Sequence, residues 1–229
     1  MRVYVGYEER EAESFRLACA SAESFNCEVV PLYEQRLRNW GLFSRPVDVR
    51  DGRQVDLYSN APQATRFATA RFATVLLAHT GWALFVDCDV LFMQDPHKLL
   101  EIVDPNKAVS VVKHKVDPAS MTGTKMDSQA QTFYHRKLWS SVMLFNCDHP
   151  ANQRLNVQML NSRPGRELHA FCWLADDEIG ELPPEWNWLV GVQPKPEHPA
   201  IAHYTLGTPE LLPNCEHADL WEQAKERLL

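Results

Sequence analysis

The sequence predicts an α/β protein with a largely parallel central sheet. Strand-like and helix-like segments alternate through the first half of the chain, which is typical of β-α-β units. The 229 residues are 45% hydrophobic, which is enough for one sizeable core and favours one domain. Two aspartates, Asp87 and Asp89, follow an apolar run, and ligands of such sheets bind beyond the carboxyl ends of the strands. The functional site is therefore expected at that edge.

The first part of the chain contains two predicted strands and one helix. Residues 2–6 alternate apolar and polar side chains, and residues 28–33 predict a second strand. Between them, residues 9–25 place apolar side chains on one helical face. Residues 46–60 are polar and irregular, and they contain a turn signal at Asp51-Gly52.

A second helix is predicted over residues 60–78, because Pro62 stands where proline is favoured in a first helical turn. His79-Thr80-Gly81 closes it. Three further strands are predicted at residues 82–87, 108–112 and 140–146. The segment 117–137 is polar and has no clear period, so it is a candidate for a mobile active-site loop.

The last third of the chain is rich in proline, tryptophan and histidine, and its periodicity is poor. We expect one short strand at residues 200–204 and a closing helix at residues 220–229. The alternation in the first half therefore carries the prediction of the fold class.

Charge and composition exclude some functions. The formal net charge is −7 and no basic run occurs, which argues against nucleic-acid binding through phosphate neutralisation. We see no signal peptide and no apolar stretch long enough to span a bilayer. The six cysteines form no C-x-x-C pair and lie mostly in apolar contexts, as reduced thiols do. These features predict a cytoplasmic location.

Asp87 and Asp89 stand in the run Leu84-Phe85-Val86-Asp87-Cys88-Asp89-Val90-Leu91-Phe92. Residues i and i+2 of a strand share a face, so the two carboxylates can aim at one point. Convergent oxygens suit a hard divalent cation. The alternative is a strand that ends in a turn, where aspartate is common, but apolar residues resume directly after Asp89.

Other polar groups have both a functional and a structural interpretation. His203 follows an apolar strand and precedes a Gly and Pro loop, although a histidine there is often structural. The acidic run 176–178 also suits a solvated helix start. Arg66, Arg71 and Lys113 are candidates to meet phosphate oxygens, or else surface charges.

Taken in order, these segments resemble the retaining glycosyltransferases of family 8, the glycogenin and galactosyltransferase type, and most closely a bacterial branch of it. The resemblance covers nearly the whole chain. Gly6-Tyr7 resembles the family's nucleotide-base site, and Arg71-Phe72 resembles the Arg-Leu that helps hold the nucleotide. Phe85 to Asp89 resembles the Asp-x-Asp strand whose carboxylates hold Mn²⁺ on the donor diphosphate.

The second half matches the family in the same way. Residues 140–146 resemble the strand that begins Asn-Ser/Ala-Gly-Val, and Asp176-Asp177 falls at the family's Asp-Gln on the sugar-binding floor. Residues 182–187 resemble Leu-Pro-x-x-Tyr-Asn, and residues 203–209 resemble the histidine motif that completes the metal site. The chain departs from the family in having Asp177 in place of glutamine, and Thr208 where a phosphate-binding lysine is usual.

The resemblance implies one GT-A domain over residues 1–229, with a Rossmann-like central sheet. It implies transfer of a hexose from a nucleotide-sugar, with UDP as the expected nucleotide, to an acceptor hydroxyl with retention of configuration. The acceptor would be a saccharide, a lipid-linked acceptor or a protein.

The resemblance also implies the site residues. Asp87, Asp89 and His203 would hold Mn²⁺ or Mg²⁺. Asp176 and Asp177 would be catalytic. The nucleotide-sugar would contact residues along the carboxyl edge, namely Gly6, Tyr7, Arg71, Asp87, Lys113 and Gly207.

Two alternatives stay open. One is a non-catalytic nucleotide-sugar-binding protein of the same fold, which the missing lysine favours. The other is a sugar-phosphate nucleotidyltransferase, which is disfavoured because Glu8-Glu9 follows Gly6-Tyr7 where a triphosphate would need a Gly-rich, basic loop.

Overall fold

The computed structural model describes residues 1–50, 53–115, 124–125, 129–130, 136 and 138–229. Its strands are β1 (Arg2–Gly6), β2 (Glu28–Leu32), β3 (Val47–Arg50), β4 (Arg53–Asp56), β5 (Ala61–Pro62), β6 (Trp82–Val86), β7 (Val90–Phe92), β8 (Val109–Val111), β9 (Thr124–Lys125), β10 (Gln129–Ala130), β11 (Val142–Asn146), β12 (Ile179–Glu181), β13 (Trp188–Leu189) and β14 (Ile201–His203). Its α-helices are α1 (Ala12–Glu23), α2 (Glu34–Asn39), α3 (Thr74–Ala78), α4 (Leu99–Ile102), α5 (Val157–Ser162), α6 (Gly165–His169) and α7 (Ala218–Leu228). Its 3-10 helices are η1 (Glu9–Glu11), η2 (Ala70–Ala73), η3 (Pro96–Lys98), η5 (Trp139–Ser141), η6 (Pro150–Arg154), η7 (Asp176–Glu178) and η8 (Pro184–Asn187).

The central sheet has six strands in the order β12-β8-β11-β6-β1-β2. Strand β1 pairs in parallel with β2 and β6, and β12 pairs in parallel with β8. Only β11 runs antiparallel to its neighbours in this sheet. The α/β class and the largely parallel sheet predicted from the sequence are therefore confirmed.

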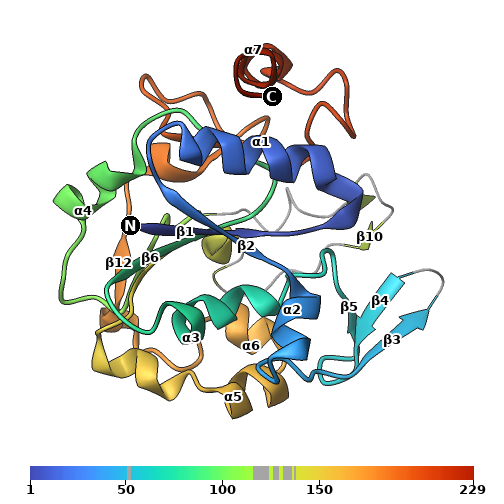
Figure 1. The fold of residues 1–229 in the computed structure, drawn as a ribbon, viewed down its shortest axis with the longest axis vertical. Coiled ribbons are helices and arrows are strands. Elements are labelled where there is room, and N and C mark those ends of the chain that lie inside the picture. The colour runs from blue at the N-terminus through green and yellow to red at the C-terminus, as the bar shows by residue number, and fades with distance from the viewer. Residues whose placement is uncertain (51–52, 116–123, 126–128, 131–135, 137) are drawn as a thin grey trace.

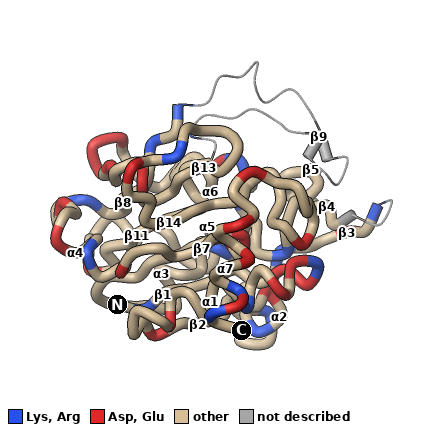
Figure 2. Tube along the Cα trace, turned by 90° about the horizontal axis from the view of Figure 1, so that it is seen from above, with Lys and Arg blue, Asp and Glu red and all other residues tan. Residues whose placement is uncertain are grey.

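Helices cover both faces of the central sheet. Figure 1 shows α1 and α7 on one face, and α3, α5 and α6 on the other. An ion pair between Lys225 and Glu13 joins α7 to α1. Figure 2 shows that basic and acidic residues are interspersed along the described part of the chain. Strand β6 of the central sheet is covered by helices on both faces, which explains why its sequence is a continuous apolar run.

A second sheet has the order β13-β14-β7. In it, strands β13 and β14 from the C-terminal third of the chain lie next to β7, which directly follows Asp87 and Asp89. Strand β14 runs antiparallel to β7, with His203 opposite Val90. The backbone N–H of Tyr204 donates to the carbonyl of Asp89 at 2.9 Å. This pairing brings His203 beside Asp89 although the two residues are far apart along the chain.

The predicted helix over residues 60–78 is only partly correct. Its first residues form strand β5, where Asp56 pairs with Ala61, and the helical part is limited to η2 and α3. Proline is tolerated in a two-residue edge strand as well as in a first helical turn, so Pro62 did not distinguish the two. His79, at a φ of 60°, and Gly81, at 72°, end the helix as expected.

The segment 46–60 was predicted to be irregular, and this was wrong. It contains the antiparallel strands β3 and β4, with Val47 opposite Asp56. Residues 47–50 alternate valine with charged side chains and precede Asp51-Gly52, which together are a hairpin signal, but the polar composition of the segment and its mostly exposed side chains led to the wrong prediction. The predicted turn at Asp51-Gly52 lies outside the described residues, as does most of the predicted loop 117–137.

The other predicted strands and helices agree with the structure within a few residues, whereas α2, β7, α4, α5, α6, β12 and β13 were not predicted. All six cysteines lie in the described part of the chain and are free thiols. Among the helices that the structure describes, each is too short or too polar to cross a membrane.

Candidate metal site and adjoining pocket

Asp87, Asp89 and His203 form one cluster, which we call the Asp–Asp–His group. Their ligand atoms all lie within 4.8 Å of one another. His203 Nε2 is 3.3 Å from Asp89 Oδ1. The intervening Cys88 is buried in the core, as the alternation of an extended chain requires. The structure thus brings together the three residues that were predicted as metal ligands.

Arg71, on η2, holds the first aspartate of this group. Its Nη1 lies 2.7 Å from Asp87 Oδ1 and also donates to the Ser140 carbonyl at 2.8 Å. Its guanidinium lies over the rings of Phe67 and Phe85, 5.2 Å from each centroid. Arg71 is buried, so its charge acts on Asp87 with little solvent screening.

The Asp–Asp–His group fits a divalent cation. Arg71 balances one of the two carboxylates, which leaves one net negative charge if His203 is neutral. A set of carboxylate oxygens and one imidazole nitrogen suits Mn²⁺, and an all-oxygen set would suit Ca²⁺ better. The buried His203 side chain and the two part-buried aspartates make this a preformed cluster with limited access to solvent.

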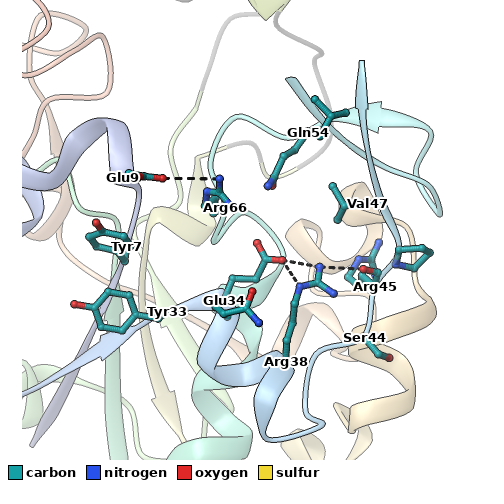
Figure 3. Close-up of a pocket in the computed structure, with 13 residues that line it drawn as sticks. Tyr7, Glu9, Tyr33, Glu34, Arg38, Ser44, Arg45, Val47, Gln54 and Arg66 are labelled. Carbon is teal, nitrogen blue, oxygen red and sulfur yellow. Dashed lines mark hydrogen bonds and ion pairs between the residues drawn. The ribbon is translucent and has the colours of Figure 1, made fainter. Parts of the chain in front are cut away.

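A pocket of about 560 Å³ opens beside the ends of β1 and β2. Tyr7 and Tyr33 line one side of it, with ring centroids 4.7 Å apart, as Figure 3 shows. Residues of the β3–β4 hairpin line the other side. Both tyrosines directly follow strands of the central sheet, so the pocket lies at the carboxyl edge where ligands of α/β sheets bind.

Gly6 is required by close packing at this edge. A Cβ atom at this position would lie 2.5 Å from the ring of Phe67. The same ring supports Arg71. Gly6 therefore lets strand β1 approach Phe67, the ring on which Arg71 lies. Of Gly6 and Tyr7, only Tyr7 lines the pocket.

The pocket wall carries both signs of charge. Glu34 pairs with Arg38 at 2.6 Å, and Arg66 lies 3.9 Å from Glu9. The Arg66 side chain is half exposed, so this second pair is a loose one. Arg66 is therefore a basic group that a ligand in the pocket could engage with little loss of protein contacts.

Lys113 and Gly207 do not join the Asp–Asp–His group through any contact that the structure describes. Lys113 Nζ donates to the Ile179 carbonyl at 3.0 Å and lies over the Trp139 ring. Gly207 closes a turn onto the Tyr204 carbonyl with a φ of 133°. Thr208, which replaces the family lysine, is buried with its hydroxyl 2.8 Å from Ser14 Oγ on α1.

Asp176 and Asp177 lie on η7, which leads into the amino end of β12. Asp176 pairs with Arg136 and is largely exposed, whereas the Asp177 carbonyl accepts from Lys107. In the described part of the chain, no contact joins either residue to the Asp–Asp–His group. Their catalytic role stays a prediction, and their position fits a solvated helix start.

His114, which sequence reasoning missed, is a buried histidine near the Asp–Asp–His group. Its Nδ1 contacts Gln193 Nε2 at 3.3 Å. Burial, and secondarily the nearby His203, lower the pKa of His114 from 6.5 to about 4. It stood next to Lys113 without any periodic or motif signal, so no sequence feature marked it.

The shift predicts acid sensitivity. Because the folded pKa is lower, the unfolded chain binds the proton more tightly, so stability falls as the pH drops from about 6.5 to about 4. We expect His114→Gln to remove up to about 3 kcal/mol of this loss. Urea unfolding at several pH values measures the free energy of unfolding of the wild type and of His114→Gln. Identical pH profiles for the two proteins would contradict the assignment of this stability loss to His114. His169, shifted in the same direction, remains in both proteins.

Comparison with known proteins gives relatives in sequence and in structure. No protein-family model matches the chain. Among solved structures, similarity is found to galactosyltransferase LgtC bound to donor and acceptor sugar analogues, with a TM-score of 0.56, 12% identity and coverage of 100% of this chain and 96% of that one. The bifunctional glycosyltransferase WbbM gives a TM-score of 0.61 at 14% identity, covering 100% of this chain and 50% of that one. The glycosyltransferase GlyE of Streptococcus pneumoniae gives 0.58 at 13% identity, covering 98% and 59%.

At these identities the structural likeness shows the fold, and the predicted GT-A fold is confirmed. The bacterial branch stays a prediction, since the curated relative is a plant protein. Protein CDI of Arabidopsis thaliana is 37% identical over 231 residues, which span 96% of this chain and 84% of the plant protein. The chain therefore belongs to the same family as Arabidopsis Protein CDI.

Proposed function

We propose that the protein is a metal-dependent glycosyltransferase. It transfers a hexose from a nucleotide-sugar, with UDP as the nucleotide, to an acceptor hydroxyl with retention of configuration. The single observation that carries the proposal is the Asp–Asp–His group at the carboxyl edge of a GT-A sheet, the same edge that carries a pocket lined by two tyrosines. The acceptor is a saccharide, a lipid-linked acceptor or a protein.

The donor nucleotide is assigned to the pocket and its diphosphate to the Asp–Asp–His group. Tyr7 and Tyr33 offer aromatic surface for the base. Arg66 on the pocket wall is the basic group that we assign to the phosphates, in place of Lys113 and of the absent family lysine. We assign Arg66 and not Lys113 because the ammonium group of Lys113 is hydrogen-bonded to the Ile179 carbonyl, whereas the guanidinium group of Arg66 is half exposed.

In the reaction, the bond between the anomeric carbon and the β-phosphate oxygen breaks and negative charge develops on the departing diphosphate. The acceptor oxygen forms the new bond to the anomeric carbon, and its hydroxyl proton leaves with the diphosphate. Asp87, Asp89 and His203 would hold a divalent cation, which would supply Lewis-acid stabilisation of that charge. The protein itself fixes Asp87 in advance, because Arg71 forms an ion pair with Asp87 and donates a hydrogen bond to the Ser140 carbonyl. Such preorganisation avoids rearrangement during the reaction.

The non-catalytic alternative rests on two contacts. Thr208 is buried against Ser14, and Lys113 is bonded to the Ile179 carbonyl, so two positions that could provide positive charge do not provide it. A protein that keeps the fold and binds nucleotide-sugars without turnover would show these features. Release of UDP from the donor separates the two functions.

A thermal-shift panel tests the binding part of the proposal. We expect UDP-hexoses to raise the melting temperature when Mn²⁺ is present and to have little effect in EDTA, because binding to the folded state stabilises it. GDP- and ADP-hexoses serve as controls for the base. Equal stabilisation by all nucleotides, or stabilisation that EDTA leaves unchanged, would contradict the proposed donor site.

A further inference from the structure

A chain of hydrogen bonds with a fixed direction ends at His203. It begins at the Leu138 carbonyl, which can only accept. Ser141 Oγ donates to this carbonyl at 2.8 Å, and this uses its single proton. Asn187 Nδ2 lies 2.9 Å from Ser141 Oγ, and must therefore be the donor of that bond.

The direction continues through the amide of Asn187. With its NH₂ group turned to Ser141, its Oδ1 faces His203 Nδ1 at 2.9 Å. An amide oxygen only accepts, so His203 Nδ1 carries the proton. The neutral ring then has its lone pair on Nε2, the nitrogen that lies 3.3 Å from Asp89 Oδ1.

The environment of this chain favours one arrangement. Asn187 and His203 are almost completely buried, so an unpaired polar atom at either would be costly. Leu138 adopts a left-handed backbone, with φ at 68° and ψ at −5°. Non-glycine residues in this conformation cost energy and persist where surrounding contacts require them. Here the strained residue, Leu138, provides the carbonyl at which the chain of hydrogen bonds begins.

Ser141 also contacts the other side of the metal group. Its backbone carbonyl accepts from the Asp87 N–H at 3.0 Å, while its side chain accepts from Asn187. Ser141, the last residue of η5 before β11, thus fixes the backbone of Asp87 and, through Asn187, the ring of His203. Two of the predicted ligands, Asp87 and His203, are therefore linked through this residue.

We propose that Asn187 is a positioning residue that holds His203 in the Nδ1–H tautomer, so that Nε2 is available to a divalent cation. The inference rests on the proposed function for the role of the metal, whereas the tautomer itself depends only on the hydrogen bonds. Metal-bound histidines donate their other ring N–H in this way, and loss of the acceptor typically weakens metal binding about 10- to 100-fold.

The chain offers a matched control in Asn152, a second buried asparagine. Its Nδ2 donates to the carbonyls of Ala108 and Asn146, and its Oδ1 accepts from Trp173. These contacts lie at the other end of β8 and β11, away from the Asp–Asp–His group. Asn152→Ala therefore removes an equally buried amide without touching His203.

The first readout is the tautomer of metal-free protein at pH 8, from ring nitrogen shifts with ¹⁵N-labelled histidine. His203→Gln identifies the resonances among the nine histidines. We expect Nδ1–H in the wild type and in Asn187→Asp, whose carboxylate still accepts. We expect loss of this single form in Asn187→Ala and its retention in Asn152→Ala. A wild-type His203 protonated on Nε2 alone, with no proton on Nδ1, overturns the proposal without any variant.

The second readout is Mn²⁺ affinity, from the electron paramagnetic resonance signal of the free ion. Asn187→Ala should bind Mn²⁺ about 10- to 100-fold more weakly than the wild type, whereas Asn187→Asp and Asn152→Ala should stay close to it. Equal weakening in Asn187→Ala and Asn152→Ala would show a general packing effect and overturn the positioning role. A wild type that shows the Nδ1–H tautomer but binds no Mn²⁺ would contradict the proposed function instead.

Discussion

Replacing Asp89 with asparagine is expected to abolish Mn²⁺-dependent binding of UDP. The substitution keeps the size of the side chain but removes the charge nearest to His203 Nε2, and the Asp–Asp–His group then has no net negative charge left beside Arg71. We expect Mn²⁺ affinity to fall by more than about 100-fold, beyond the usual effect of changes outside the ligand set. Calorimetric titration of UDP in the presence of Mn²⁺ measures the consequence.

Asp104→Asn is the matched control for this experiment. Asp104 is exposed, caps the following turn at Asn106 N, and lies before β8 at the amino edge of the sheet. It should bind UDP and Mn²⁺ like the wild type. Unchanged Mn²⁺-dependent UDP affinity in Asp89→Asn would remove Asp89 from the metal site.

The largest effect on stability is expected from Asp56→Ala. Arg45 and Asp56 form a completely buried bidentate pair, with Nε–Oδ1 at 3.0 Å and Nη2–Oδ2 at 2.6 Å. Removing the carboxylate leaves the Arg45 charge buried without its partner, which costs about 3–5 kcal/mol. Urea unfolding followed by circular dichroism measures the free energy of unfolding.

Asp48→Ala on the same hairpin is the control for this loss. Asp48 pairs with Arg50 at 3.0 Å, but both side chains are about half exposed, and such pairs contribute at most about 1 kcal/mol. A loss in Asp56→Ala no larger than that in Asp48→Ala would contradict the structural role of the buried pair. Because the hairpin lines the pocket, weaker nucleotide binding should accompany its loosening.

The acidic pair and the main strands could be predicted because their signals are local. Asp87 and Asp89 interrupt an apolar run, and buried parallel strands such as β6 are continuously apolar. His203 was identifiable as a ligand only through the resemblance, since its approach to Asp89 depends on the pairing of β14 with β7. Sequence patterns do not specify pairing between segments that are so far apart.

Most of what sequence reasoning missed depends on tertiary contacts, although the β3–β4 hairpin also had a local signal in its alternating valines and Asp51-Gly52. The β3–β4 hairpin has exposed strands and is anchored from inside by Arg45, which also donates to carbonyls of Leu160 and Arg163. Lys113 was a candidate for phosphate binding because of its charge, and Thr208 was noted because it replaces a charged lysine. The structure shows instead what each side chain contacts. Asn187 stood in a family-like motif, but its role follows only from the direction of its hydrogen bonds.

The central claim is that the protein cleaves a nucleotide-sugar with the help of the Asp–Asp–His group. The most direct measurement is UDP release from a panel of UDP-hexoses, with Mn²⁺ or with EDTA, for the wild type and Asp89→Asn. We predict Mn²⁺-dependent release by the wild type from at least one donor, and none by the variant or in EDTA. Binding of a UDP-hexose by the wild type without any UDP release, or release that EDTA and Asp89→Asn leave unchanged, would contradict the account.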